Sequence, residues 1–227
     1  MRNVLCYVAA ALVVGHSTRE ATARIIDDFS VGPLSVVQGA TPLLEIQSGL
    51  DPSHVVGGGR RIVTSVGGGS AGQAVTIDTA AKTFTFGSGP SSLGYMFGQY
   101  GSSQSPLGLD LTADDATHFV VIFEKTGVTG NSATTPPQFT FFNFPGGGTI
   151  LFEPSILLGD GRRLARAAFS NHPTINFSNV SQITFGVSRY STNATFVLHS
   201  IATVPEPSTG IIASVGALLL LAVFRRR

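Results

Sequence analysis

The acidic side chains of the sequence are the first candidates for chemistry. Asp27 and Asp28 form an adjacent pair in the stretch IIDDFS. Calcium takes several oxygen ligands, so paired carboxylates could contribute to a calcium site. In a regular strand, however, neighbouring side chains point to opposite faces, and the pair could not hold one ion without a bulge. The residues alone therefore favour a solvated strand end over a metal site.

Two glutamates are candidates for a hydrolase. Glycoside hydrolysis uses two carboxyl groups that face each other across a cleft, and Glu124 and Glu153 could supply them. Glu124 ends the apolar run HFVVIFE, where a surface charge at a strand end is the simpler interpretation. The many serines lack a G-x-S-x-G elbow, and the histidines after residue 23 lack the close spacing of a zinc site. We therefore predict a protein without catalytic residues, with a glycoside-active enzyme as the weakest alternative.

Aromatic side chains could bind a sugar by stacking, but the sequence contains no tryptophan. The stretch LGYMFGQYGSS places three aromatic residues among glycine and polar residues. We interpret this stretch as a loop in which Phe97 packs into the core and the tyrosines are exposed. Tyr95 and Tyr100 are then the candidates for a ligand-binding site.

Charge and cysteine content exclude several classes of function. Between Arg24 and Val204, nine basic and eleven acidic side chains leave a net charge of −2, although the whole chain carries +1. A weakly acidic body lacks the basic surface that nucleic-acid binding requires. The single cysteine, Cys6, lies in the N-terminal apolar run, so the body has no disulfide and no cysteine ligand for a metal. We expect no nucleic-acid partner and no resident cofactor.

The elements that must position these residues are short strands. Apolar and polar residues alternate in Val75–Asp78 and again in Thr83–Phe86, which is the pattern of half-buried strands. Clusters of Gly, Ser, Pro and Asn separate these runs from their neighbours. Residues 24–203 are therefore predicted to form one all-β domain, a β-sandwich or jelly roll. The stretch GRRLARAAF, at residues 161–169, fits a short helix or a strand, and Asp114-Asp115 is predicted to lie in a turn.

The N-terminus has the order of a secretory signal peptide. Arg2 is followed by an apolar run over Val4–Gly15, and Ala21-Thr22-Ala23 has the A-x-A pattern of a cleavage site. Residues 1–23 are therefore predicted to direct export. The charged stretch HSTRE leaves the cleavage point less defined than the export itself.

The C-terminus, residues 204–227, carries a second targeting pattern. Gly210–Phe224 contains no charged residue and is bounded by Pro207 and by Arg225, Arg226 and Arg227. A helix of this length rises about 22 Å, against about 30 Å for the hydrocarbon core of a bilayer, and the arginine stems extend its reach. The terminal arginines predict a cytoplasmic end. We therefore predict a transmembrane helix that stops export at the membrane.

The C-terminal segment, residues 204–227, resembles the PEP-CTERM sorting signal of Gram-negative and related bacteria. The matching residues are Pro205, Glu206 and Pro207, then the apolar helix, then Arg225–Arg227. In that family the tripeptide is recognised by a membrane transpeptidase, exosortase. The resemblance implies removal of the tail and delivery to the cell surface or to extracellular polysaccharide. A glycosylphosphatidylinositol anchor lacks such an arginine cluster, and a plain single-pass anchor is the remaining alternative.

The first and last strands of the body resemble those of jelly-roll domains on secreted bacterial proteins, including carbohydrate-binding modules. The stretches concerned are IIDDFS and ATFVLHSIATV. In such domains an acidic residue near the first strand can hold structural calcium, so the resemblance implies calcium at Asp27 and Asp28 as an alternative. Our leading hypothesis is a non-catalytic β-sandwich protein of the cell surface or extracellular matrix. The second is a carbohydrate-binding module, calcium-dependent or not, that binds extracellular polysaccharide.

Overall fold

The structure is a computed structural model, and it describes residues 23–39, 43–65, 72–88, 95–127, 134–143, 146–188 and 194–206. Most of the predicted signal peptide and the whole predicted apolar helix lie outside these ranges. Within them, no helix has the length and apolar character needed to span a bilayer.

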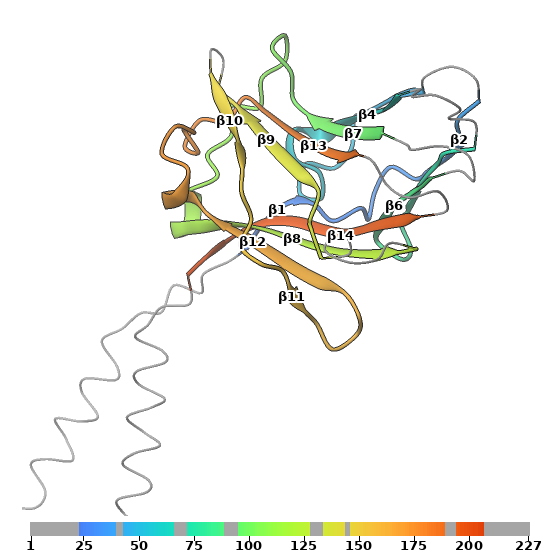
Figure 1. The fold of residues 1–227 in the computed structure, drawn as a ribbon. Helices are drawn as coiled ribbons and strands as arrows, with labels where there is room; N and C mark the ends of the chain where they lie inside the picture. Colours follow the sequence, from blue (N-terminus) through green and yellow to red (C-terminus); the bar gives the residue numbers. More distant parts are fainter. Residues whose placement is uncertain are drawn as a thin grey trace, which may run out of the picture.

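Two antiparallel sheets pack face to face, which confirms the predicted β-sandwich (Figure 1). The eight-stranded sheet has the order β11 (Ile156–Leu157), β12 (Arg163–Ala168), β8 (Ala116–Thr126), β14 (Thr195–Pro205), β6 (Thr83–Gly87), β5 (Ala74–Asp78) and β2 (Leu34–Val37), with β1 (Arg24–Asp27) paired to β14. The six-stranded sheet has the order β10 (Gly147–Ile150), β9 (Gln138–Phe142), β13 (Gln182–Ser188), β7 (Tyr95–Tyr100), β4 (Gly59–Ser65) and β3 (Leu44–Ser48).

Several predicted elements are present. The two strands predicted from alternation, β5 and β6, are present and pair with each other, with Val75 opposite Phe86 and Ile77 opposite Phe84. The stretch that fitted either a helix or a strand is the strand β12, which pairs along β8. Asp114 and Asp115 lie in a short 3₁₀ turn with positive φ angles of 58° and 59°, a conformation that aspartate tolerates better than most residues.

The interpretation of LGYMFGQYGSS as a loop was wrong. Residues 95–100 form β7, a central strand between β13 and β4. Along this strand Met96 and Tyr100 point into the core, whereas Phe97 is only partly buried. The period of two was present in the sequence, but the surrounding glycines and polar residues obscured it.

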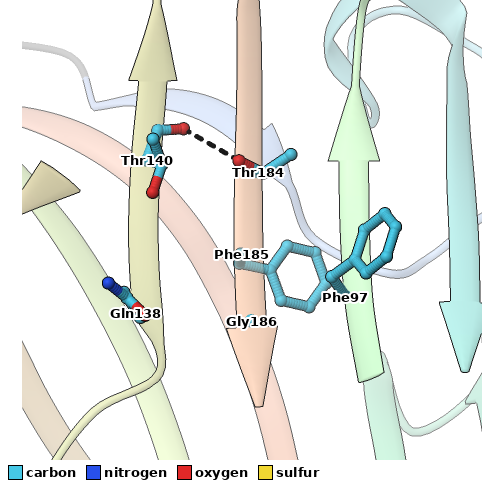
Figure 2. A pocket seen from close by; sticks show the side chains of 6 residues that line it. All are labelled: Phe97, Gln138, Thr140, Thr184, Phe185 and Gly186. Carbon is cyan, nitrogen blue, oxygen red and sulfur yellow. Dashed lines mark hydrogen bonds between the residues drawn. The ribbon is translucent and has the colours of Figure 1, made fainter. Parts of the chain in front are cut away.

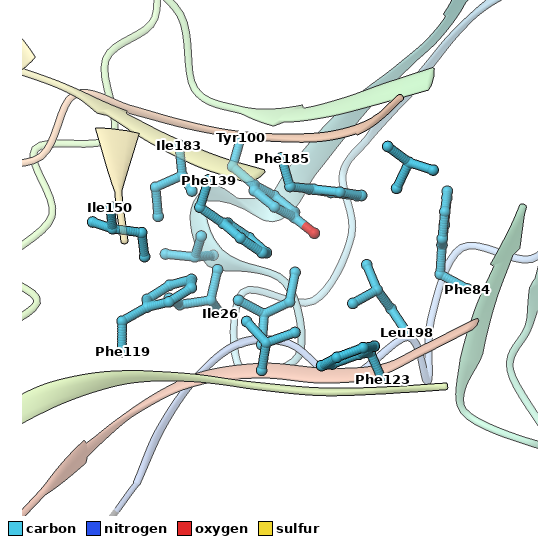
Figure 3. Packing of buried hydrophobic residues seen from close by; sticks show 14 of the residues in the cluster. Ile26, Phe84, Tyr100, Phe119, Phe123, Phe139, Ile150, Ile183, Phe185 and Leu198 are labelled. Atoms are coloured by element: carbon cyan, nitrogen blue, oxygen red, sulfur yellow. The ribbon is translucent and has the colours of Figure 1, made fainter. Parts of the chain in front are cut away.

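Phenylalanine dominates the core between the sheets (Figure 3). The ring of Phe185, on β13, lies 5.7 Å from the rings of both Phe84 and Phe139, centroid to centroid, and 6.1 Å from that of Tyr100. Gly98, on the neighbouring strand, faces this ring, and a Cβ at that position would collide with it. The aromatic residues therefore connect the two sheets through Phe185.

The two ends of the described body lie side by side. β1 pairs antiparallel with β14, and Arg24 lies opposite Thr203. β14 continues to Pro205, two residues beyond the predicted end of the domain, and Glu206 follows with an exposed side chain. The first two residues of the predicted sorting tripeptide thus lie at the end of the last strand, and Pro207 lies outside the described residues.

Candidate functional site on the outer face of the six-stranded sheet

The outer face of the six-stranded sheet carries two parallel rows of side chains that run across its strands. Strand register places one row in the order Thr149, Thr140, Thr184, Gln99, Arg61 and Ile46. The second row has the order Gln138, Gly186, Phe97, Val63 and Leu44. Along β4, β7, β9 and β13 these residues alternate with buried residues, so they point away from the core, and Leu44 and Ile46 on β3 are exposed.

A hollow of about 230 Å³ lies where the rows pass over β9, β13 and β7 (Figure 2). Gly186 forms its floor, because a glycine there leaves the space between Phe97 and Gln138 empty. A Cβ added to Gly186 would meet no atom within 4 Å. The hollow therefore has an aromatic side chain on one side and an exposed amide on the other.

Threonine hydroxyls border the same hollow. Thr184 Oγ1 donates to the Thr140 carbonyl oxygen at 3.2 Å, and the Oγ1 atoms of Thr140 and Thr149 lie 3.0 Å apart. Each hydroxyl can donate one hydrogen bond and accept others, so these groups retain capacity for a polar ligand. The hollow thus combines an apolar surface with neutral hydrogen-bonding groups.

A larger groove of about 570 Å³ lies beside β3, β4 and the loop after β7. Arg61 and Gln99 line it, as do the exposed side chains of Leu44 and Ile46. Gln99 Nε2 donates to the Gly101 carbonyl oxygen at 2.7 Å, and Arg61 Nη1 donates to Gln99 Oε1 at 3.4 Å. Because Gln99 is nearly buried, these two bonds hold the Arg61 guanidinium over the groove.

Tyr100, one of the two predicted ligand-binding tyrosines, lies in the core instead. Its side chain is fully buried, and its hydroxyl donates to Asp27 Oδ2 at 2.9 Å. A ligand on the surface has no access to it, so the stacking role expected for Tyr100 is corrected. Tyr95 begins β7 opposite Ser188, but its side chain lies outside the described part of the structure. The aromatic side chain that lines the hollow is Phe97, which we had expected in the core.

Asp27 accepts hydrogen bonds from three groups in the interior. Arg60 Nη1 lies 3.0 Å from Asp27 Oδ2, and the Phe29 amide donates to Oδ1 at 2.8 Å, in addition to the Tyr100 hydroxyl. Arg60 also donates to the Val31 carbonyl oxygen at 2.5 Å, and both charged side chains are almost completely buried. Burial raises the pKa of Asp27 from 3.8 to about 6, although the nearby Arg60 charge and the hydrogen bonds act in the opposite direction.

This raised pKa predicts a pH-dependent stability. Because the folded-state pKa lies above the ordinary value, Asp27 favours the folded state most below pH 4, and that contribution is lost as the pH rises through 6. An Asp27→Asn variant cannot titrate at this position. We expect the unfolding free energy of the natural chain, minus that of the variant, to fall by about 2 kcal/mol between pH 4 and pH 7. Urea denaturation of both proteins across this range measures the difference; a constant difference would contradict the prediction.

The structure does not support calcium at Asp27 and Asp28. Asp27 is paired with Arg60, so an arginine already supplies the positive charge there. Asp28 binds its own turn instead: Oδ1 accepts from the amide and hydroxyl of Ser30, and Oδ2 lies 2.9 Å from His54 Nδ1. Within the described residues, no three His, Cys, Asp or Glu side chains are grouped as a metal site. The donor set therefore does not fit the ion.

The structure also separates Glu124 from Glu153. Glu153 Oε2 accepts from Arg166 Nε at 2.6 Å, and Arg166 lies opposite Val120 on β8. Val120 is four residues from Glu124 along the strand, roughly 13 Å at the usual rise of a β-strand. Catalytic pairs in glycosidases are about 5–9.5 Å apart. Glu124 lies instead on the outer face of the eight-stranded sheet, where its Oε2 atom is 3.7 Å from His199 Nε2.

Sequence reasoning missed the main residues of this site. Gln138 lies on β9, Gly186 on β13 and Phe97 on β7, and only the sheet order makes these three strands neighbours. A partial signal was present in QITFGVS, where buried Ile183, Phe185 and Val187 alternate with outward positions. That alternation indicates a solvent-facing glycine, but not what lies beside it.

Comparison with known proteins identifies structural similarities only. No family model and no curated protein matches this chain. Among solved structures, the chain resembles the carbohydrate-binding module CtCBM11 with a TM-score of 0.39 and 14% identity, over 83% of this chain and 98% of that one.

Two further solved structures match this chain with similarly low TM-scores and identities. A family 11 carbohydrate-binding module from Clostridium thermocellum, solved with a β-1,3-1,4-mixed-linked tetrasaccharide, matches with a TM-score of 0.37 and 13% identity over 81% of this chain and 95% of that one. The xyloglucanase domain of NopAA from Sinorhizobium fredii, solved with cellobiose, matches with a TM-score of 0.37 and 10% identity over 75% of this chain and 98% of that one. Similarity at this level assigns no function to the chain, so the geometry of its own site has to support one.

Proposed function

We propose that this chain is an exported, non-catalytic protein that binds a polysaccharide on the outer face of its six-stranded sheet. The observation that carries the proposal is the hollow over Gly186, between Phe97 and Gln138. A sugar ring has apolar C–H faces and a rim of hydroxyl groups. An aromatic side chain that faces amide and hydroxyl groups suits both parts of such a ring.

The direction of the two rows also suits a chain-like ligand. They cross the strands, which are spaced about 4.8 Å apart, a distance close to the length of one sugar unit. The hollow and the groove lie on the same face of the sheet. Gln99 on β7 and Arg61 on β4 lie between the strands under the hollow and the edge strand β3. An extended oligosaccharide lying along the rows would therefore meet a new pair of side chains at about every sugar unit.

Filling the hollow tests this proposal. A Gly186→Leu variant should retain its fold, because the added side chain has open space, but it should weaken binding at least tenfold, or about 1.4 kcal/mol. The control is Gly87→Leu, which fills an equally open position on β6 of the other sheet. Affinity electrophoresis of the full-length chain against neutral and acidic polysaccharides measures the effect. Equal affinities for both variants would contradict the assignment of the site.

Export is the second part of the proposal. It is supported by the signal-peptide pattern at residues 1–23 and by the tripeptide Pro205-Glu206-Pro207 ahead of an apolar tail with three arginines. Glu206 follows the last strand directly and its side chain is exposed, which suits recognition of this glutamate by a processing enzyme. Tracking the tagged protein in cells with and without exosortase tests this part; an uncleaved membrane form in both strains would contradict it.

A further inference from the structure

We infer that the polysaccharide bound by this face carries carboxylate groups, and that Arg61 binds them. This inference rests on the proposed function and adds the chemical class of the ligand. Among the described outward positions of the six strands, Arg61 is the only charged side chain. The groove beside it is likewise lined by neutral residues, apart from Arg61 and the buried Arg60.

Within the described ranges, Arg61 differs from its neighbour Arg60 in having no acidic partner. Arg60 is neutralised by Asp27 in the interior, whereas no carboxylate of the described residues lies within 4.0 Å of Arg61. Its Nη1 atom donates to Gln99 Oε1 at 3.4 Å. The remaining N–H groups of the guanidinium are therefore available to a ligand in the groove. The guanidinium is a positively charged group with several hydrogen-bond donors and no acceptor.

The Arg61 guanidinium has a hydrogen-bond partner, Gln99, that the ligand need not touch. Gln99 is nearly buried, and its Nε2 atom is committed to the Gly101 carbonyl oxygen at 2.7 Å. That bond turns the Gln99 amide oxygen toward Arg61 and holds the guanidinium on the sheet. A planar guanidinium held in this way can bind a carboxylate through two parallel hydrogen bonds, which is the strongest contact it offers.

The position of Arg61 on the sheet indicates which unit of a bound sugar chain would lie beside its charge. It lies opposite Gln99 and one strand beyond β7, on which Phe97 borders the hollow. A sugar stacked on Phe97 would thus place a unit of the same chain, one or two residues further on, beside the guanidinium. A carboxylate on every unit or every second unit would meet this requirement, as in polymers of uronic acids.

Two cellulose derivatives with the same backbone test the inference. Carboxymethylcellulose carries carboxylates and hydroxyethylcellulose does not, and polygalacturonate serves as a natural uronate polymer. We expect the full-length chain to bind the two carboxylated polymers at least about fivefold more tightly than hydroxyethylcellulose at low salt. Arg61→Gln should remove this difference. The matched control is Arg166→Gln, at an exposed arginine on the opposite sheet, which should preserve it.

The possible outcomes separate the inference from the proposed function. Equal binding of charged and uncharged polymers, unaffected by Arg61→Gln, would overturn the inference and leave the binding face intact. An equal loss with Arg61→Gln and Arg166→Gln would show a general charge effect and would also overturn it. Absence of binding to neutral and acidic polysaccharides alike would overturn the proposed function itself.

Discussion

Replacing Arg60 by methionine is expected to lower the unfolding free energy at pH 7 by about 3–5 kcal/mol. The Asp27 carboxylate is fully buried, and Arg60 is the positive charge beside it, 3.0 Å away. Methionine preserves most of the apolar volume but leaves a carboxylate in the core without a counter-charge. The cost should shrink toward pH 4, because Asp27, with its pKa raised to about 6, is then protonated in the folded state.

The adjacent arginine provides the control for this prediction. Arg61→Met removes the same charge one residue away, but from the exposed face, where its cost in stability should stay within about 0.5 kcal/mol. Guanidinium denaturation of both variants at pH 7 and pH 4 measures the two effects. Equal costs for Arg60→Met and Arg61→Met would show that the buried pair has no special role.

Truncating Phe185 to alanine is expected to cost a further large amount, about 3–5 kcal/mol of unfolding free energy. The ring contacts those of Phe84, Phe139 and Tyr100, and it covers Gly98 on the next strand. Its removal leaves a cavity that β-strands on both sides cannot close easily. The loss should appear as a lower denaturation midpoint.

Phe97→Ala is the matched comparison, since the same atoms are removed from the outer face of the same sheet. Phe97 is partly exposed, so its loss should destabilise the fold much less, while it should weaken polysaccharide binding. Comparing the Phe185→Ala and Phe97→Ala variants thus separates an effect on stability from an effect on binding. A larger loss of stability with Phe97→Ala than with Phe185→Ala would contradict the assignment of core and surface.

Local pattern made the sandwich predictable, because alternation in stretches such as Val75–Asp78 and Thr83–Phe86 marks which side chains face inward. The same alternation was present in β7, where Met96 and Tyr100 point inward and Phe97 outward. The glycines around β7 favoured a loop in the prediction. Phe97 was therefore assigned to the core and Tyr100 to the surface, which is the reverse of their positions in the structure. The error followed from giving composition more weight than period.

Other features depend on contacts that sequence separation hides. A register shift between Ile25 and Asp27 breaks the alternation of β1, so that Ile26 and Asp27 are both buried. The pairing of Asp27 with Arg60 spans 33 positions, and that with Tyr100 spans 73. The hollow over Gly186 likewise requires the order β9, β13 and β7, which no local pattern specifies.

The central claim is that a polysaccharide binds across the outer face of the six-stranded sheet. Its most direct test is an NMR titration of the isotope-labelled full-length chain in detergent with an oligosaccharide of the tightest-binding polymer. We expect chemical-shift changes concentrated at Gln138, Thr184, Gly186 and Phe97, and small changes along β5 and β6 of the other sheet. Changes concentrated on the eight-stranded sheet, with the Gly186 region unchanged, would contradict it.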